Sequence, residues 1–282
     1  MNTIRLQNKT WSLELAPDFG MNPISLRYKG EPVLREPASV IELCKTPLLY
    51  GIPVLFPANR TKDAKFTFDG VEYHLPLNEP DRFNNLHGCL YTTPFTVLEQ
   101  TEDRVVSCLR NIRQCFPFPF TMRFTDTLTE QGYRREVELH NDGQTPMPVT
   151  ISFHSTFVEP DSFTVGVGER FEFDRYYIPT WKMLPLNDVE QTFPTSCVPR
   201  GNVISAYYTS TGNVARIGRY RYTVENFDEW IFYNGNSYEG YLCVEPQHGM
   251  VNGFNHPDGH TRLDAGKSIR FALQIELWRA TV

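Results

Sequence analysis

Short runs in which hydrophobic and polar residues alternate follow one another along most of this chain, and glycine, proline, asparagine or aspartate closes each run. An alternation with a period of two is typical of strands that bury one face, and the closing residues are turn formers. No window contains a long, well-capped hydrophobic stripe with the helical period of about 3.6 residues. Many strands without helical crossovers favour antiparallel sheets stacked face to face, or a barrel. The sequence therefore predicts an all-β fold.

The alternation also predicts individual strands. Residues 120–129 and 133–140 form an expected hairpin, and residues 95–99 are expected to pair with 104–109 across a polar turn. A shorter hairpin is expected over residues 65–75, because its Asp-Gly dipeptide suits the positive φ angles of a type I′ turn. Further strands are expected at residues 11–15, 149–153, 241–245 and 268–278.

Composition limits the partners and the location of the protein. The 282 residues are 40% hydrophobic, enough for a large core, and with no linker or repeat we expect residues 1–282 to form one domain. The formal charge of −6 is spread along the chain and argues against a nucleic-acid or anionic-membrane partner. No stretch approaches the roughly 18 apolar residues of a membrane span. The first ten residues lack the apolar run of a signal peptide, so a cytoplasmic location is expected.

The cysteines are scattered and form no CxxC pair. We predict that all of them are free thiols in a reducing compartment. They are Cys44, Cys89, Cys108, Cys115, Cys197 and Cys243.

Two short motifs lie on either side of the 65–75 hairpin. Residues 51–60 end in Asn59-Arg60, and residues 84–88 contain His87. The hairpin is expected to return both motifs to one edge of a sheet. Arginine is a permanent, forked hydrogen-bond donor, and histidine exchanges protons near neutral pH. The two residue types together suit a polyhydroxylated substrate.

Two further residues are candidates for acid–base chemistry. His154 lies at or near the end of an alternating strand, and Glu245 ends an apolar strand just before a proline. A carboxylate in that position is partly desolvated, which raises its pKa toward the range of a general base.

In order and spacing, these motifs resemble the aldose 1-epimerase (galactose mutarotase) family. The resemblance is most specific over residues 59–88 and is supported by residues 141–154, 178–180, 243–247 and 263–267. It implies a large antiparallel β-sandwich with the sugar held in a cleft on the concave face. It further implies that no metal or organic cofactor is used, and that the partner is a small sugar. A monomer or homodimer is expected.

The family resemblance also implies roles for the candidate residues. Glu245 is the base that takes the proton from the anomeric hydroxyl, and His154 is the acid that protonates the ring oxygen. The ring then opens, and closure from the other face gives the other anomer. His87 is the third catalytic residue, and Asn59 and Arg60 bind the sugar.

The chain departs from the family pattern in two places. The second histidine is followed by Ser155-Thr156-Phe157 instead of Pro-Tyr-Phe. Near residues 203–207 there is no counterpart of the aspartate that grips sugar hydroxyl groups. The residues expected to replace it are Tyr207, Trp181, His248 and Asp228.

Three alternative functions remain open at this point. The first is a non-catalytic sugar-binding or sensor module on the same fold. The second is a hexose-6-phosphate 1-epimerase, for which Lys182, Arg216 and Arg219 are the available basic residues. The third is a cupin-like metalloenzyme with His87, His154 and Glu245 as ligands, although the short His-x-His pair of cupins is absent.

Overall fold

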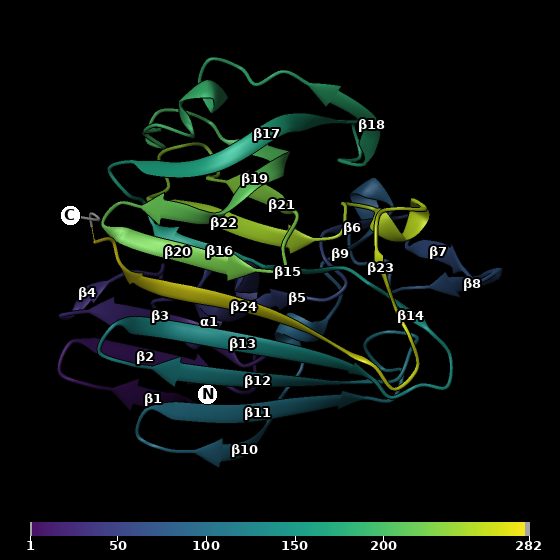
Figure 1. Ribbon diagram of the computed structural model, residues 1–282, viewed down its shortest axis with the longest axis horizontal. Coiled ribbons are helices and arrows are strands. Elements are labelled where there is room, and N and C mark those ends of the chain that lie inside the picture. The colour runs from purple at the N-terminus through teal and green to yellow at the C-terminus, as the bar shows by residue number, and fades with distance from the viewer. Residues whose placement is uncertain (1, 280–282) are drawn as a thin grey trace.

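The computed structural model describes residues 2–279, and most of these residues lie in antiparallel strands (Figure 1). The expected all-β sandwich is confirmed. The described part of the chain contains no helix long and apolar enough to cross a membrane.

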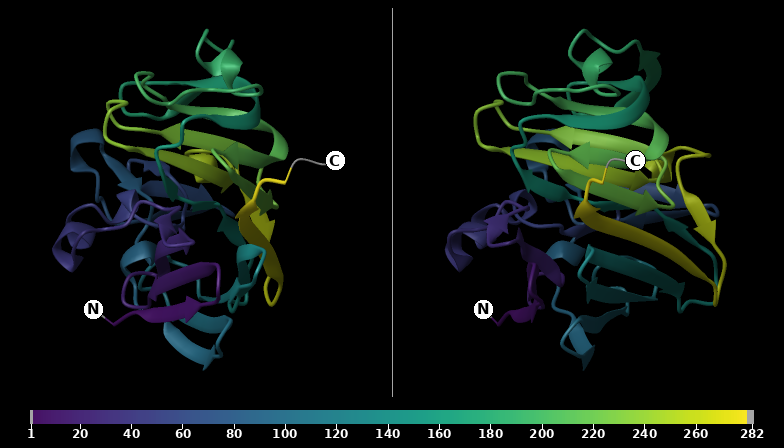
Figure 2. Two further views of the ribbon diagram at one scale, coloured as in Figure 1. Left: turned by 90° about the vertical axis from the view of Figure 1, so that its left-hand side faces the viewer. Right: turned by 60° about the vertical axis from the view of Figure 1, so that its left-hand side comes forward.

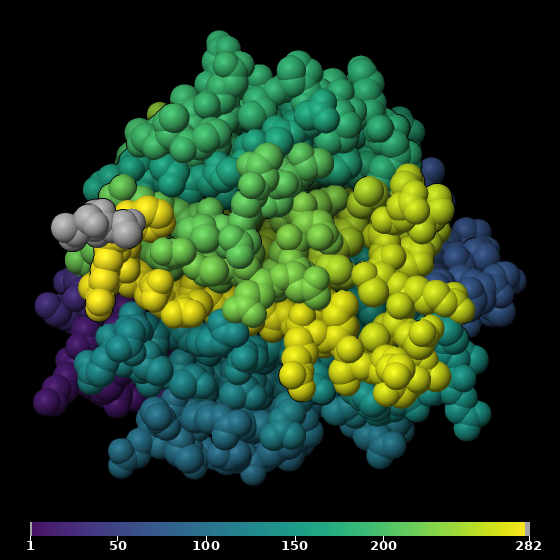
Figure 3. All heavy atoms as spheres, viewed as in Figure 1, coloured from purple at the N-terminus to yellow at the C-terminus, as the bar shows by residue number. Residues whose placement is uncertain are grey.

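One large sheet of 14 strands forms the body of the molecule. Its main path is β10 (Thr96–Gln100), β11 (Arg104–Asn111), β12 (Phe120–Leu128), β13 (Gly132–Asn141), β24 (Ser268–Leu277), β20 (Tyr220–Glu225), β19 (Ser205–Ile217), β21 (Glu229–Tyr233), β22 (Tyr241–His248), β15 (Ile151–Phe153) and β5 (Val54–Leu55). Off this path, β16 (Ser155–Val158) pairs with β22, and β17 (Phe163–Phe173) pairs with β19 and with β18 (Pro179–Leu184). In the space-filling view, β24 forms a yellow band between the teal β12–β13 hairpin and the green β20 (Figure 3).

Smaller sheets and short helices complete the fold. A four-stranded sheet contains β1 (Ile4–Gln7), β2 (Trp11–Ala16), β3 (Asn22–Tyr28) and β4 (Glu31–Pro32). The two-stranded sheets pair β6 (Arg60–Lys62) with β9 (Asn84–Leu86), β7 (Lys65–Phe68) with β8 (Val71–His74), and β14 (Met147–Val149) with β23 (Thr261–Leu263). The helices are α1 (Val40–Lys45) and the 3-10 turns η1 (Pro47–Leu49), η2 (Pro80–Arg82), η3 (Leu90–Thr92), η4 (Glu190–Thr192) and η5 (Gly253–Asn255).

The N-terminal sheet packs against the large sheet as a second layer. Figure 2 shows its purple strands beside the teal and yellow strands of β12, β13 and β24. Trp11 and Leu13 of β2 are fully buried in the same core cluster as Phe120 and Phe124 of β12. Burial of aromatic and branched side chains between two sheets, at about 25 cal/mol per Å² of apolar surface, is the main force that holds such layers together.

The strand predictions agree closely with the structure. The hairpin expected at residues 120–140 is β12–β13, and the pair expected at residues 95–109 is β10–β11. The hairpin around Asp69-Gly70 is β7–β8, and both turn residues have the positive φ angles, 50° and 78°, that a type I′ turn requires.

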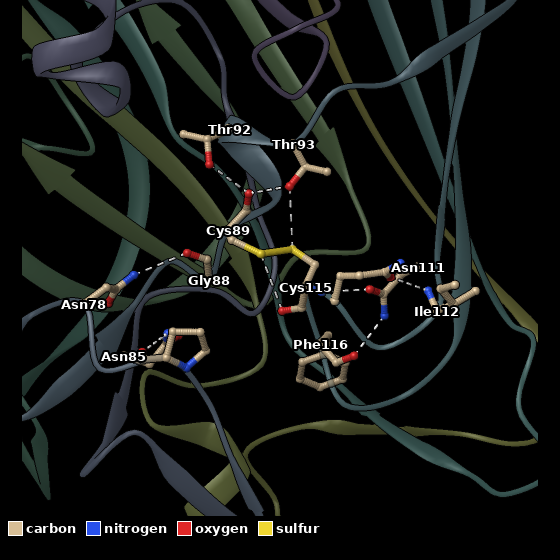
Figure 4. The surroundings of a disulfide bond; sticks show 12 residues. Asn78, Asn85, Gly88, Cys89, Thr92, Thr93, Asn111, Ile112, Cys115 and Phe116 are labelled. Carbon is tan, nitrogen blue, oxygen red and sulfur yellow. Dashed lines mark hydrogen bonds between the residues drawn. A yellow bond between two sulfur atoms is a disulfide. The ribbon is translucent and has the colours of Figure 1, made fainter.

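The prediction that all cysteines are free thiols is wrong for one pair. Cys89 and Cys115 form a disulfide, with their Cα atoms 5.8 Å apart, which is the ordinary separation for such a bond. Figure 4 shows the bond between the segment that follows Gly88 and the loop after β11. The two cysteines are 26 residues apart in the sequence, and only the folded chain brings these segments together.

Candidate active site

A row of side chains across four neighbouring strands forms the floor of the site. The strand register pairs Tyr207 of β19 with Ile231 of β21, and Ile231 with Glu245 of β22. Because Ile151 pairs with His248 and Ser155 with Val244, the same register places His154 opposite Glu245. His154 lies at the break between β15 and β16, so it occupies the strand end that the sequence predicts.

His154 and Glu245 are in direct contact. The Nε2 atom of His154 lies 3.3 Å from Oε1 of Glu245, and the two residues are only 6% and 3% exposed. Burial disfavours both charged forms. It raises the pKa of Glu245 to about 8, although the nearby Arg60 opposes the shift, and it lowers the pKa of His154 to about 4. At neutral pH the pair therefore holds a single titratable proton, which lies on the Glu245 carboxyl, and the His154 ring is neutral.

Arg60 is held on β6 by a buried carboxylate. Its Nε and Nη2 atoms donate to the two carboxylate oxygens of Glu79, each at 2.9 Å, and its Nη1 donates to the hydroxyl of Tyr207 at 3.0 Å. Glu79 also accepts hydrogen bonds from Arg82 and Asn84. Burial opposes ionisation of Glu79, but these hydrogen bonds, first that from Arg60, outweigh it and lower the pKa. Glu79 therefore fixes the Arg60 side chain and offsets its charge. The third nitrogen of Arg60, Nη1, points toward the row of side chains on the floor of the site.

His87 approaches the same group from the loop after β9. Its backbone N–H donates to the carbonyl of Asn59 at 2.7 Å, and its ring lies perpendicular to that of His154, with centroids 5.6 Å apart. Burial, the neighbouring His154 and Arg60 hold the pKa of His87 well below its usual range, so the ring is a neutral hydrogen-bonding group. Gly88 makes this approach possible: its φ is +62°, and a Cβ there would lie 2.2 Å from the carbonyl oxygen of Phe56.

These side chains line a cavity of about 510 Å³. Its polar side carries Asn59, Arg60 and His87, beside the His154–Glu245 pair. The segment around η1 and the end of β21 supply more apolar lining. The remaining lining residues are Lys45, Thr46, Pro47, Leu48, Leu49, Arg82, Tyr91, Tyr177, Ser205, Ala206, Tyr207, Ile231, Phe232 and Tyr233. The structure therefore brings together six of the eight predicted site residues.

The other two predicted sugar-binding residues lie outside this cavity, which corrects the expectation for them. His248 is three positions after Glu245 on β22 and therefore faces the other side of the sheet, since strand side chains alternate. There it contacts Thr261 and Asp228. Trp181 lies on β18, the edge strand beyond β17, and its ring packs on His256 with centroids 4.3 Å apart.

Sequence reasoning missed three residues that shape the site. Glu79 fixes Arg60, and the ring of Tyr177 lies beneath the guanidinium groups of both Arg60 and Arg82, at 4.9 and 4.6 Å. Tyr177 directly precedes the Ile178-Pro179-Thr180 segment that carries the family resemblance. Glu79 and Arg82 lie in the sequence between the two N-terminal motifs, so their positions could have marked them as candidate site residues.

Among the residues that the structure describes, one set is spaced closely enough to hold a metal ion. It consists of His154, Cys243 and Glu245, whose possible ligand atoms all lie within 4.8 Å of one another. It contains a thiol in place of the His87 that a cupin-like site would use. Burial and the adjacent Glu245 hold the pKa of the Cys243 thiol well above its usual range. A metal bound at this set would have to displace the thiol proton.

Comparison with known proteins agrees with this geometry. The sequence model of the aldose 1-epimerase family matches residues 2–276. The chain belongs to the aldose 1-epimerase family.

Solved structures with the same fold share little sequence with this chain. A galactose mutarotase-like protein from Clostridium acetobutylicum has a TM-score of 0.90 at 19% identity, over 99% of this chain and 95% of that protein. An aldose epimerase homologue from C. elegans has a TM-score of 0.80 at 17% identity, over 99% of each chain. The galactose 1-epimerase of Lactobacillus acidophilus NCFM has a TM-score of 0.80 at 14% identity, over 97% of this chain and 93% of that protein. At such identities the comparison establishes the fold alone.

Proposed function

We propose that this protein is an aldose 1-epimerase that interconverts the α and β anomers of a free sugar. The observation that carries the proposal is the contact of 3.3 Å between His154 and Glu245 in the wall of a cavity. Ring opening requires removal of a proton from the anomeric hydroxyl and delivery of a proton to the ring oxygen. Both oxygens are bonded to one carbon, so two groups in contact can each reach one of them.

In this mechanism Glu245 takes the hydroxyl proton and His154 protonates the ring oxygen. The aldehyde forms, the C1 group rotates, and the two proton transfers run in reverse as the ring closes on the other face. The pair starts and ends each turnover with one proton. The two pKa shifts place that proton on Glu245 in the free protein, so it passes to His154 across their 3.3 Å contact before Glu245 acts as the base. Each matched proton transfer contributes about 10²–10⁴-fold to the rate.

The neighbouring groups stabilise charge on the sugar oxygens. Arg60 presents Nη1, and His87 presents a neutral ring that can donate or accept a hydrogen bond. The Tyr207 hydroxyl, whose pKa is raised to about 12 by burial, stays protonated and lies beside Arg60. We propose that Tyr207 takes over part of the hydroxyl recognition of the missing aspartate.

The basic residues predicted for a phosphate do not line the cavity, which favours a neutral sugar over a phosphosugar. The cations that do line the cavity are Lys45 and the two arginines Arg60 and Arg82, which share the single carboxylate of Glu79. Lys182, one of the basic residues available for a phosphate, lies outside the lining and pairs with Glu172.

The test is polarimetry of freshly dissolved α-anomers. The panel contains glucose, galactose, xylose, rhamnose and glucose 6-phosphate, with Glu245→Gln as the matched variant. Faster mutarotation of at least one sugar that is lost in the variant supports the proposal. Tight binding of a sugar with no acceleration of any of them would favour the sensor module instead.

A further inference from the structure

A disulfide anchors the chain segment that brings two lining residues to the cavity. His87 and Tyr91 both line the cavity, and Cys89 lies midway between them in the sequence. Cys89 is bonded to Cys115 in the loop between β11 and β12, which are strands of the large sheet (Figure 4). The bond therefore joins the part of the cavity wall that carries His87 to the body of the molecule.

The His87 ring is positioned by its backbone. Its buried Nδ1 atom makes no hydrogen bond to any residue that the structure describes. The backbone here is left-handed, with φ of +61° at His87 and +62° at Gly88. A non-glycine residue keeps such a φ only where its surroundings impose it. The place of the ring in the cavity thus depends on the contacts that fix this stretch of backbone.

The other end of the disulfide is firmly held. The side-chain oxygen of Asn111, at the end of β11, accepts a hydrogen bond from the backbone N–H of Cys115 at 2.9 Å. The amide nitrogen of Asn111 donates to the carbonyls of Phe116 and Phe118 at 2.9 and 2.8 Å. Both phenylalanines belong to the buried core, and Cys115 itself is 6% exposed. Cys115 is therefore a fixed point to which the His87 segment is tied.

The bond can be opened from the Cys89 side. Cys89 is partly exposed, and the other cysteines of the described chain are free thiols. A thiolate of a dithiol reductant attacks Sγ of Cys89, the S–S bond breaks, and Cys115 leaves as a thiolate that takes up a proton. The second thiol of the reductant then attacks the mixed disulfide and releases Cys89. Two electrons and two protons pass to the protein, and the reductant becomes a cyclic disulfide.

We propose that the Cys89–Cys115 disulfide is a redox-sensitive positioning group for His87, which a dithiol reductant opens and a small disulfide oxidant restores. Without the bond, hydrogen bonds and packing alone hold the His87 backbone, and the ring loses its fixed place in the cavity. A displacement of 1 Å in an active site can cost about 10²-fold in rate. The inference rests on the proposed epimerase function for its kinetic readout.

The test follows mutarotation by polarimetry before and after reduction with dithiothreitol, on a sugar that the wild type epimerises. Reduction should lower kcat/KM by about 10- to 100-fold, and oxidised glutathione should restore it. Cys89→Ser and Cys115→Ser should each start at the low value and should not respond to dithiothreitol. Cys108→Ser, which removes a partly buried free thiol, is the matched control and should respond as the wild type does.

His87→Gln separates positioning of His87 from general support of the fold. Reduction should change kcat/KM of this variant by less than about twofold, because the side chain that the disulfide positions is already gone. Equal losses on reduction in His87→Gln and in the wild type would overturn the assignment to His87. A lower melting temperature on reduction, with kcat/KM of the folded protein unchanged, would also overturn it.

Two measurements need no catalysis. Iodoacetamide should label Cys89 and Cys115 only after reduction, and labelling of both in the oxidised protein would overturn the proposal. Reduction should speed backbone hydrogen exchange in residues 87–92. If no sugar is epimerised but exchange rises in that segment, the proposed function fails and the redox-sensitive anchor stands. If a sugar is epimerised and reduction changes neither exchange nor kcat/KM, the redox proposal is overturned and the function stands.

Discussion

Glu245 on β22 stands opposite His154, which lies at the break between β15 and β16, and their reactive atoms are 3.3 Å apart. The contact follows from strand register, because the pairings on either side of it place residue 154 across from residue 245. Side chains held by a sheet lose little freedom when substrate arrives, so the acid and the base are preorganised. The following predictions depend on this relationship.

Glu245→Gln should lower kcat by about 10²–10⁴-fold, because the amide keeps the shape of the side chain but cannot accept the proton. His154→Gln should cause a loss of similar size. The double variant should lose far less than the product of the two single losses, since the residues act as a unit. Rates come from polarimetry under saturating sugar. Additive losses would show that the two residues act independently and would contradict the mechanism.

The pH–rate profile should be bell-shaped. Below about pH 4 both members of the pair are protonated and no base remains, and above about pH 8 both are deprotonated and no acid remains. The two apparent values belong to the coupled pair. Arg60 opposes the rise in the pKa of Glu245, so Arg60→Met should move the alkaline limb to higher pH. An alkaline limb that stays in place would show that Glu245 does not set it.

Glu245 should also lower the stability of the protein at alkaline pH. Its pKa is raised from 4.5 to about 8 on folding, so the stabilising contribution of its bound proton is complete below pH 4.5 and is lost as pH rises through 8. Glu245→Gln carries no such charge. Its melting temperature should exceed that of the wild type at pH 9 by about 3 °C or more, with a smaller difference at pH 5. Glu72→Gln, at an exposed position, is the control and should show no such trend.

Much of this architecture was predictable because it depends on local patterns. The alternation of Phe120, Met122 and Phe124 specifies a strand with one buried face, and the Asp69-Gly70 turn specifies a hairpin. His154 and Glu245 could be selected because a histidine or a carboxylate at the end of an apolar run is unusual. The prediction that Glu245 ends its strand is wrong, since β22 continues to His248.

The rest depends on contacts between segments far apart in the sequence. The partnership of Arg60 with Tyr207 joins residues 147 positions apart, and the Cys89–Cys115 disulfide depends on how two loops pack. Trp181 was a reasonable stacking candidate by residue type, but the edge position of β18 removes it from the cavity. Local patterns predict strands, whereas register and loop packing decide which side chains meet.

Glu79→Gln should impair the site through Arg60. The glutamine amide can accept only one of the two hydrogen bonds from Arg60, and it leaves the positive charge of Arg60 uncompensated. KM should rise, and the alkaline limb should move to lower pH, because a stronger positive charge favours ionised Glu245. Substitution of a residue that merely supports the fold would not move the pH limb. Glu138→Gln, which removes a more exposed partner of Arg270, is the matched control.

The buried pair between Asp126 and Arg135 should matter for folding and not for catalysis. Asp126 on β12 and Arg135 on β13 are cross-strand partners with fully buried side chains, and Nε and Nη2 of Arg135 donate to the two carboxylate oxygens at 2.7 and 3.0 Å. Asp126→Asn leaves a buried guanidinium without its counter-charge and should lower the free energy of unfolding by about 3–5 kcal/mol. Asp69→Asn removes the partner of Arg262 in a pair that is half exposed and should lower the free energy of unfolding far less. Urea unfolding gives both values, and kcat of the folded Asp126→Asn protein should equal that of the wild type. Equal losses of stability in the two variants would show that burial does not set the importance of this pair.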